Sequence, residues 1–155
     1  MPSNIGKNLM PRHFIVTADG GSRGNPGAAA YGAVIYENDK VVKEIGAAIG
    51  EASNNVAEYS GLIAGLKAVN EIDPAATILV KMDSKLVIEQ MSGRWKVKHP
   101  NMQKLVKEAF TCHDPKLVSY QWIPREENSH ADSILNDVLD SGMSVSYTHL
   151  TLPTN

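Results

Sequence analysis

Three things are scarce in this 155-residue sequence: cysteine, long apolar runs and an excess of charge of one sign. The single cysteine, Cys112, excludes an internal disulfide, and no stretch approaches the roughly 20 apolar residues of a membrane-spanning helix. The opening MPSNIGKNLMPRHF lacks the apolar core of a signal peptide. We therefore expect a cytoplasmic protein that does not bind a membrane.

Charge is nearly balanced, with 17 acidic and 15 basic residues and a formal net charge of -2 at pH 7. Any surface that binds nucleic acid must therefore be a local basic patch, because the molecule as a whole is not basic. With 43% hydrophobic residues, the chain is long enough for one core and too short for two comfortable ones. We expect one domain.

The two ends of the chain differ in pattern from the middle. Residues 1–11 are predicted to be a disordered leader, and residues 12–141 to be the domain. Residues 142–155 are predicted to be a disordered tail, because they follow the helix-stopping Ser141-Gly142 and show no helical period. The segment VSYTHLTLPT in this tail resembles the translated read-through of a transposase-derived sequencing adapter. That origin would make the source a metagenomic assembly and leave the natural C-terminus unknown; the alternative is a genuine disordered tail.

Strand and helix patterns alternate through the domain. A turn pair, Asn38-Asp39, joins two of three consecutive antiparallel strands, and two later apolar runs indicate further strands. Apolar residues at helical spacing indicate the helices. The expected strands are 13–18, 29–37, 40–49, 76–82 and 116–123, and the expected helices are 56–70, 84–91, 101–113 and 129–140. This order predicts an α/β fold with a five-stranded mixed sheet, in which two parallel strands follow three antiparallel ones, and with helices on both faces.

Four acidic residues each have an ordinary structural explanation when taken alone. Asp19 precedes two glycines, a pattern that is most often only a turn. Asp83 lies between a buried strand and a helix, where an aspartate commonly caps the helix. Glu58 follows Asn55 by three residues, as in a capping box, and Asp132 lies in the first turn of the last helix, where the helix dipole favours an acid.

The combination of these four acids favours a metal site. Glu58 shares a helix face with Leu62 and therefore points toward the sheet. The first and fourth strands are expected to be neighbours, so Asp19 and Asp83 emerge close together, and both acid-bearing helices begin at the same rim. Four carboxylates crowded there would raise at least one pKa or oppose folding unless cations neutralised them. Oxygen ligands without cysteine or a histidine pair select Mg²⁺ or Mn²⁺ over zinc.

Four motifs, in order along the chain, carry a resemblance to a known family. They are TADGGSRGNPG, SNNVAEYSGLIAGL, VKMDSKLVIEQMSGRWKVKHP and PREENSHAD. From about Phe14 to Asp140 the sequence resembles type 1 ribonuclease H, most closely the bacterial and archaeal branch that lacks a basic insertion after the second helix. The resemblance implies a ribonuclease H-like fold and an endoribonuclease that hydrolyses the RNA strand of RNA–DNA hybrids.

The resemblance also implies the roles of the four acids. It places the family's catalytic and metal-binding carboxylates on Asp19, Glu58, Asp83 and Asp132. These would hold two Mg²⁺ ions, with Mn²⁺ as a substitute, for a cleavage that leaves 5′-phosphate and 3′-hydroxyl ends.

Two further residues are candidates for the family's catalytic-loop histidine. Arg125 occupies the equivalent position, as in one branch of the family, and His130 lies two residues before Asp132. Both are kept as catalytic candidates for proton transfer or product release. The alternative for His130 is a residue at the start of a helix that faces solvent.

The residues expected to contact the hybrid lie in three segments. The glycine-rich backbone of GGSRGNPG can approach a minor groove, asparagine amides suit sugars and base edges, and a serine at a helix N-terminus suits a phosphate. The stretch GRWKVKHPNMQKLVK surrounds a tryptophan with basic residues, which favours contact with the DNA strand, although such a run is more often a solvated helix face. The expected residues are Gly20, Gly21, Ser22, Asn25, Ser53, Asn54, Asn55, Lys85, Trp95, Lys96 and Lys98.

Two other classes of function compete with a hybrid-specific endoribonuclease. A strand transferase or related metal-dependent nuclease also uses clustered carboxylates, but transferases usually carry added DNA-binding segments. A hybrid-binding module without activity is expected to lose at least one of the four acids, and all four are present. We expect a monomer that needs no obligate protein partner.

Overall fold

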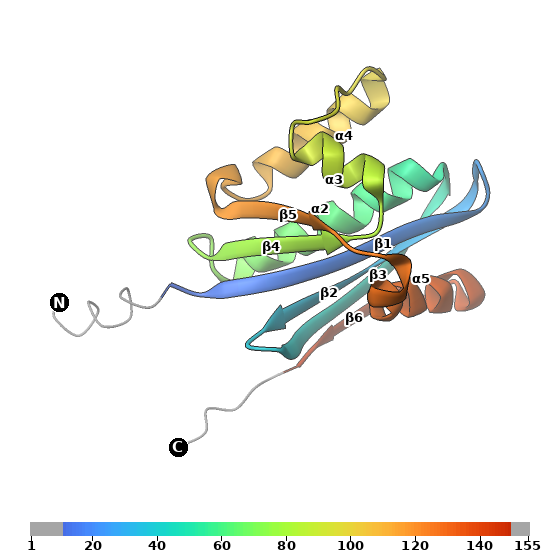
Figure 1. The fold of residues 1–155 in the computed structure, drawn as a ribbon. Coiled ribbons are helices and arrows are strands. Elements are labelled where there is room, and N and C mark those ends of the chain that lie inside the picture. Colours follow the sequence, from blue (N-terminus) through green and yellow to red (C-terminus); the bar gives the residue numbers. More distant parts are fainter. Residues whose placement is uncertain (1–10, 150–155) are drawn as a thin grey trace, which may run out of the picture.

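The computed structural model describes residues 11–149 (Figure 1). They form one mixed sheet with the strand order β5-β4-β1-β2-β3-β6. The strands are β1 (His13–Gly24), β2 (Gly27–Glu37), β3 (Lys40–Ala52), β4 (Thr77–Met82), β5 (Val118–Trp122) and β6 (Val145–Thr148). The helices are α2 (Asn54–Ile72), α3 (Lys85–Met91), α4 (Pro100–Thr111) and α5 (Ser129–Ser141), with 3-10 turns η1 (Pro115–Leu117) and η2 (Arg125–Asn128). Most of the predicted leader (1–10) and the end of the predicted tail (150–155) lie outside the described residues.

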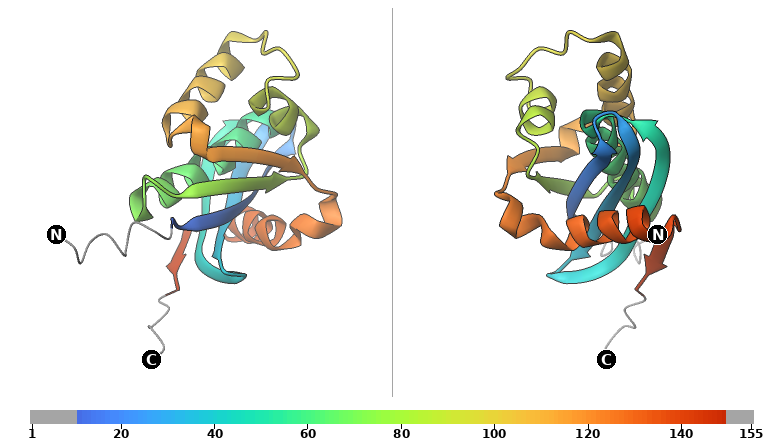
Figure 2. Two further views of the ribbon diagram at one scale, coloured as in Figure 1. Left: turned by 60° about the vertical axis from the view of Figure 1, so that its left-hand side comes forward. Right: turned by 90° about the vertical axis from the view of Figure 1, so that its right-hand side faces the viewer.

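Helices cover both faces of the sheet, as the sequence predicts (Figure 2). On one face, α2, α3 and α4 contribute to the main apolar cluster, in which Tyr59 and Leu62 of α2 are fully buried. On the other face, Leu135 and Val138 of α5 pack with Ala30 of β2. Because side chains alternate across a strand, β2 contributes to both layers. None of the helices between residues 11 and 149 has the length and hydrophobicity that crossing a bilayer requires.

The connections between strands follow the predicted order. Asn38 and Asp39 join β2 to β3 with φ angles of 53° and 65°, the backbone conformation that a two-residue hairpin turn requires. The chain then crosses through α2, and β4 pairs with β1 in parallel, as β5 does with β4. The three antiparallel strands and two parallel additions are therefore confirmed.

The first strand is longer than predicted. β1 continues through Gly24, so Asp19 lies within the strand, opposite Gly32 of β2, and not at its end. Gly20-Gly21 was expected to be a turn, but α2 packs directly over this stretch: a Cβ atom on Gly20 would lie 2.2 Å from the backbone of Ala57. Glycine is required here for the close approach of the helix, and β1 keeps its pairing with β2.

The sheet has six strands and not the predicted five. Val145–Thr148, inside the segment expected to be a disordered tail, pairs antiparallel with β3, from Gly46 opposite Val145 to Lys43 opposite Thr148. The edge backbone of β3 supplies these hydrogen bonds, so the strand needs little apolar pattern of its own, and no periodic signal in the sequence marks it. The adapter origin of the tail remains a prediction.

Candidate active site

The four predicted carboxylates open into one pocket of about 320 Å³. They come from four separate places: the middle of β1, the second turn of α2, the residue after β4 and the first turn of α5. The structure therefore brings them together, as expected from the neighbouring positions of β1 and β4. The residues that line the pocket are Asp19, Gly20, Gly21, Ser22, Arg23, Asn54, Glu58, Asp83, Arg125, Asp132, Leu135, Asn136 and Leu139.

Asp19 is the most buried of the four, with 8% of its surface exposed. Its Oδ1 atom accepts a hydrogen bond of 2.9 Å from the backbone N–H of Gly20. Burial raises the pKa of Asp19 most, followed by the negative charge of Asp83 and the neighbouring carboxyl group of Asp132, and the result is about 8. The pocket is therefore short of positive charge to balance its acids.

Glu58 faces the pocket from α2. The helix begins after Ser53, whose Oγ accepts a 3.3 Å hydrogen bond from the N–H of Val56. The alternative that Glu58 completes a capping box with Asn55 is therefore wrong. Burial raises the pKa of Glu58 to about 7, with a further increase from the charge of Asp83 and an opposing effect of the Ser84 hydroxyl, which donates to Oε1 at 3.0 Å.

Asp83 is held at both its side chain and its main chain. Ser84, and not Asp83, caps α3, because its Oγ accepts a 3.2 Å hydrogen bond from the N–H of Val87. The Asp83 carboxylate instead accepts a 2.7 Å hydrogen bond from Nδ2 of Asn128. The Asp83 carbonyl accepts one of 3.2 Å from the indole N–H of Trp122.

The sequence did not single out Asn128 or Trp122. Asn128 precedes a helix, and such an asparagine is normally expected to cap it, yet its side chain makes no capping hydrogen bond to α5. One signal was available: Asn128 and Asp132 are four residues apart, the spacing that places two side chains on one helix face. No comparable signal marks Trp122.

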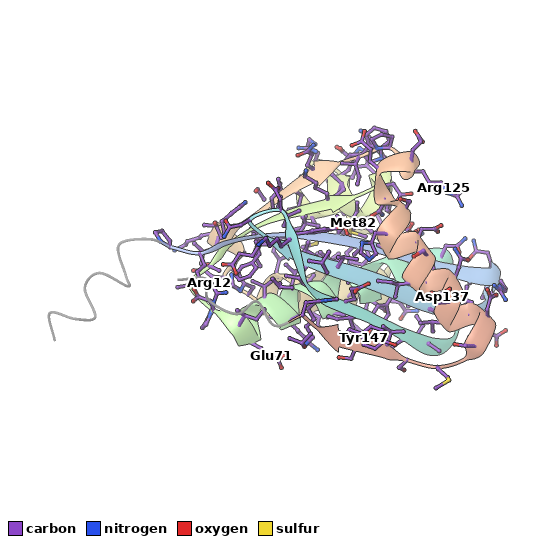
Figure 3. The ribbon with its side chains drawn as sticks, turned by 90° about the horizontal axis from the view of Figure 1, so that it is seen from below. Arg12, Glu71, Met82, Arg125, Asp137 and Tyr147 are labelled. Carbon is purple, nitrogen blue, oxygen red and sulfur yellow. The ribbon has the colours of Figure 1, made fainter. Side chains whose placement is uncertain are left out.

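The structure separates the two candidates for the catalytic-loop position. Arg125 lines the pocket with the carboxylates, and Figure 3 shows it just before the start of α5. His130 is not among the residues that line the pocket. Its Nε2 lies 2.8 Å from Oε1 of Glu44 in β3, and its Nδ1 lies 3.4 Å from the hydroxyl of Tyr36 in β2. Because its ring contacts the sheet and not the pocket, the structure does not support the catalytic role predicted for His130.

The glycine-rich segment and the start of α2 form one hydrogen-bonded unit beside the carboxylates. Oδ1 of Asn54 accepts hydrogen bonds from the backbone N–H and the hydroxyl of Ser22, at 2.9 and 3.0 Å. The backbone N–H of Asn54 donates to Oδ1 of Asn25 at 3.0 Å. Ser53 and Asn55 face away from this pocket and line a neighbouring groove between α2 and the start of α4. The predicted contact residues of these segments thus divide between two adjoining surfaces.

The basic stretch is less cationic than its sequence suggests. Arg94 donates two hydrogen bonds, of 2.6 and 2.9 Å, to the carboxylate of Glu89 and is therefore paired. Lys96 and Lys98 are exposed. Trp95 beside them is 46% exposed, an unusual state for so large an apolar side chain.

Lys85 is the first residue of α3, two residues after Asp83. Its Nζ is 5.6 Å from the centre of the Trp122 ring, within the range of a cation–π interaction, and 3.6 Å from Oε2 of Glu89. Trp122 is itself 44% exposed and hydrogen-bonded to the Asp83 carbonyl. Lys85 and Trp122 therefore form a partly exposed pair at one edge of the site.

The donor set suits a hard divalent cation. All four acids offer oxygen, and none of the ion pairs among residues 11–149 involves any of them. Burial raises the pKa of both Asp19 and Glu58. Between residues 11 and 149, no three Asp, Glu, His or Cys side chains are already arranged to enclose an ion. The four carboxylates nevertheless line one shared pocket. By chemistry and placement, the residues fit a divalent metal.

A larger pocket, of about 420 Å³, lies elsewhere between α2, α4 and β3. Its charged residues include Lys67 and Glu108, which pair with each other at 3.1 Å. Much of its remaining lining is apolar, with Ile45, Ile63 and Leu105 among it. It has no cluster of carboxylates, so the smaller pocket is the better candidate for chemistry despite its size.

Most of the chain is similar to known proteins. A family model described as "Reverse transcriptase-like" matches residues 17–138. The chain is 52% identical over 130 residues to the bifunctional protein Rv2228c of Mycobacterium tuberculosis, a match that covers 82% of this chain and 35% of that protein. It therefore spans about a third of the length of this relative.

Two solved structures are similar over most of the chain. The N-terminal RNase H domain of Rv2228c shares 50% identity, with a TM-score of 0.80, over 84% of this chain and 95% of that one. LC11-RNase H1, solved in complex with an RNA/DNA hybrid, shares 34% identity, with a TM-score of 0.77, over 83% of this chain and 98% of that one.

Proposed function

The chain belongs to the type 1 ribonuclease H family, and from this premise we propose that it is an endoribonuclease that hydrolyses the RNA strand of RNA–DNA hybrids. The products would carry 5′-phosphate and 3′-hydroxyl ends. The observation that carries the proposal is the meeting of four carboxylates from four segments in one pocket beside a glycine-lined edge. The hybrid bound to LC11-RNase H1 supports the choice of substrate. We assign this activity to residues 12–141.

We propose that Asp19, Glu58, Asp83 and Asp132 hold two Mg²⁺ ions, for which Mn²⁺ would substitute. Held by these four carboxylates, such ions would supply activation of a water molecule for in-line attack on phosphorus and stabilisation of the leaving 3′-oxygen. Asp19 is the best candidate for a shared ligand, because its pKa is raised by both Asp83 and Asp132. Its burial in β1 also fixes its backbone more firmly than a loop would.

The remaining pocket residues would position the nucleic acid. Arg125 is exposed at the rim and would pair with a phosphate of the RNA strand. Oδ1 of Asn54 already accepts from Ser22, so the amide Nδ2 is the end left to donate to a substrate group such as a 2′-hydroxyl. Gly21 lines the pocket and would let a sugar approach the β1 backbone, whereas the space beside Gly20 is filled by α2.

A second surface would follow the DNA strand. Trp95, Lys96 and Lys98 are exposed on the segment between α3 and α4. The groove lined by Ser53 and Asn55 lies between the start of α2 and the start of α4. We propose that this groove takes a DNA phosphate near the N-terminus of α2, where the helix dipole favours an anion.

Incubation with matched RNA–DNA, RNA–RNA and DNA–DNA duplexes in Mg²⁺ tests the proposed function. We expect cleavage of the RNA strand of the hybrid alone, with 5′-phosphate ends on the products and no cleavage in EDTA. Tight hybrid binding without cleavage would favour a binding module. Cleavage of the DNA duplex would favour a nuclease or transferase of another class.

Two further properties stay predictions. We propose a cytoplasmic location, in line with the single cysteine of the chain. The expectation of a monomer without an obligate partner is checked by light scattering of the purified chain.

A further inference from the structure

Asn128 is a buried polar residue next to the site. It is the last residue of η2, directly before α5, and only 2% of its surface is exposed. Its Nδ2 donates two hydrogen bonds, one of 2.9 Å to the carbonyl of Ala18 and one of 2.7 Å to Oδ1 of Asp83. A residue expected to cap a helix therefore uses its side chain to join two strands.

These contacts link three carboxylate-bearing segments. Ala18 directly precedes Asp19 in β1, and Asp83 directly follows β4. Asp132 lies one turn into α5 from Asn128 itself. Through one amide, the positions of the β1, β4 and α5 carboxylates are fixed relative to each other. No other pair of hydrogen bonds from a single side chain joins the β1 backbone to the Asp83 carboxylate within residues 11–149.

The orientation of this amide is determined by its neighbours. Both partners of Nδ2 are acceptors, so an exchange of the amide nitrogen and oxygen would place three acceptors together. The Oδ1 atom is buried and lacks a hydrogen-bond partner; it is one of only two such side-chain atoms in the described part of the chain. A buried acceptor without a partner costs stability. The fold keeps this cost at the residue that holds Asp83, which is typical of a functional constraint and not of packing alone.

We propose that Asn128 is a positioning residue that orients the Asp83 carboxylate for metal binding. Its hydrogen bond to Oδ1 fixes the rotation of the Asp83 carboxylate and so the direction in which its remaining lone pairs face an ion. Groups that orient metal ligands from outside typically affect metal affinity or activity by about 10- to 100-fold. This inference rests on the proposed function, because it gives Asn128 a role toward the metals that the four acids would hold.

A purely structural role would also predict a loss of stability on mutation, so a control is needed. His113 offers a matched one. It is 3% exposed, and its ring nitrogens lie 3.0 Å from Oδ1 of Asn70 and 2.8 Å from the carbonyl of Ala76. Ala76 precedes β4, whereas Asp83 follows it, so His113 is a buried link with two polar contacts at the opposite end of the same strand.

The test compares Asn128→Ala and His113→Ala with the wild type, without substrate and then with hybrid. Melting temperatures are measured across a Mg²⁺ titration, which reports metal binding independently of hydrolysis. We expect both variants to melt at lower temperature in EDTA. In Asn128→Ala alone, we expect the half-saturating Mg²⁺ concentration to rise about tenfold. With hybrid, kcat should fall at least about tenfold while KM stays within about twofold.

Asn128→Ser, which keeps one donor, is expected to give an intermediate Mg²⁺ requirement and carries the test if the alanine variant does not fold. A folded Asn128 variant with half-saturating Mg²⁺ and kcat within about twofold of wild type would overturn the inference. So would an equal shift in His113→Ala. Failure of the wild type to cleave hybrid would instead contradict the proposed function, since the Mg²⁺ titration tests Asn128 without substrate.

Discussion

The buried polar groups around the two ends of β4 differ in whether the protein gives them partners. At the N-terminal end, His113 is buried and both of its ring nitrogens have a partner, Asn70 and the Ala76 carbonyl. At the C-terminal end, the pKa of Asp19 is raised to about 8 and that of Glu58 to about 7. Beside them, a buried oxygen of Asn128 lacks a partner.

The groups around one end of β4 therefore serve folding, and those around the other end serve function. The His113 end is satisfied by the protein alone and contributes to folding. The carboxylate end is not satisfied by protein groups, so the fold maintains it at a cost in stability. Such a cost is typical of a site that a ligand completes. The following predictions test this difference between the two ends.

The largest effect is expected from Asp19→Asn. Loss of the carboxylate shared by the site should reduce hydrolysis of hybrid by about 10³-fold or more, because ligands of one catalytic unit act together. The same change should raise the melting temperature in EDTA at pH 8, because it removes a buried acid that is costly to ionise. Asp137→Asn, an exposed acid on α5 (Figure 3), is the matched control and should change neither property. Lower metal-free stability of Asp19→Asn would contradict the account of charge crowding.

A smaller loss is expected at the rim of the pocket. Arg125→Ala should lower kcat/KM by about 10- to 100-fold, the range for a lost charged hydrogen bond to phosphate. His130→Ala should stay within about twofold, because its ring contacts Glu44 and Tyr36 outside the pocket. Steady-state kinetics with a labelled hybrid measures both. The reverse ranking would return the catalytic role to His130.

Stability without metal is expected to fall as pH rises. Asp19 and Glu58 have folded pKa values of about 8 and about 7, above the ordinary values of 3.8 and 4.5. Between about pH 4 and pH 8 the folded state therefore binds more protons than the unfolded state, and stability decreases with pH through this window. Thermal melts in EDTA should show this decrease, and Mg²⁺ should reverse it at pH 8. A His113→Ala variant should keep the same pH slope at lower overall stability.

The smallest effect concerns the DNA-facing surface. KM for hybrid should rise several-fold between roughly 50 and 200 mM salt, because only a few exposed cations contact the backbone. Combined Lys96→Ala and Lys98→Ala should raise KM modestly and reduce this salt dependence. Lys40→Ala, an exposed lysine in the β2–β3 hairpin, is the control. A KM that does not change with salt would argue against this surface.

Sequence reasoning succeeded where a local sequence pattern is itself the physical cause of the structure. The alternation of apolar residues, the Asn38-Asp39 turn and the crossover through α2 determine the strand order, and that order places Asp19 beside Asp83. It failed where tertiary packing overrides local preference. Gly20-Gly21 is read as a turn until α2 is known to pack against it, and the short β6 depends on the edge of β3.

Within the site, helix geometry explains what was predicted and what was missed. His130 and Asp132 are two residues apart, about 200° around a helix, and so lie on opposite faces. Asn128 and Asp132 are four apart and lie on one face, which identifies Asn128 once the start of α5 is known. The link from Asn128 to the Ala18 carbonyl joins residues 110 positions apart and carries no local sequence signal.

Calorimetric titration of the wild-type chain with Mg²⁺ at pH 7, in two buffers of different ionisation enthalpy, tests the central claim most directly. If the four carboxylates form one metal site with the raised pKa values described, ions must displace protons from Asp19 and Glu58 as they bind. We predict saturable binding with net proton release, and no such release from Asp19→Asn combined with Glu58→Gln. Absence of binding, or binding without release of protons, would contradict the account.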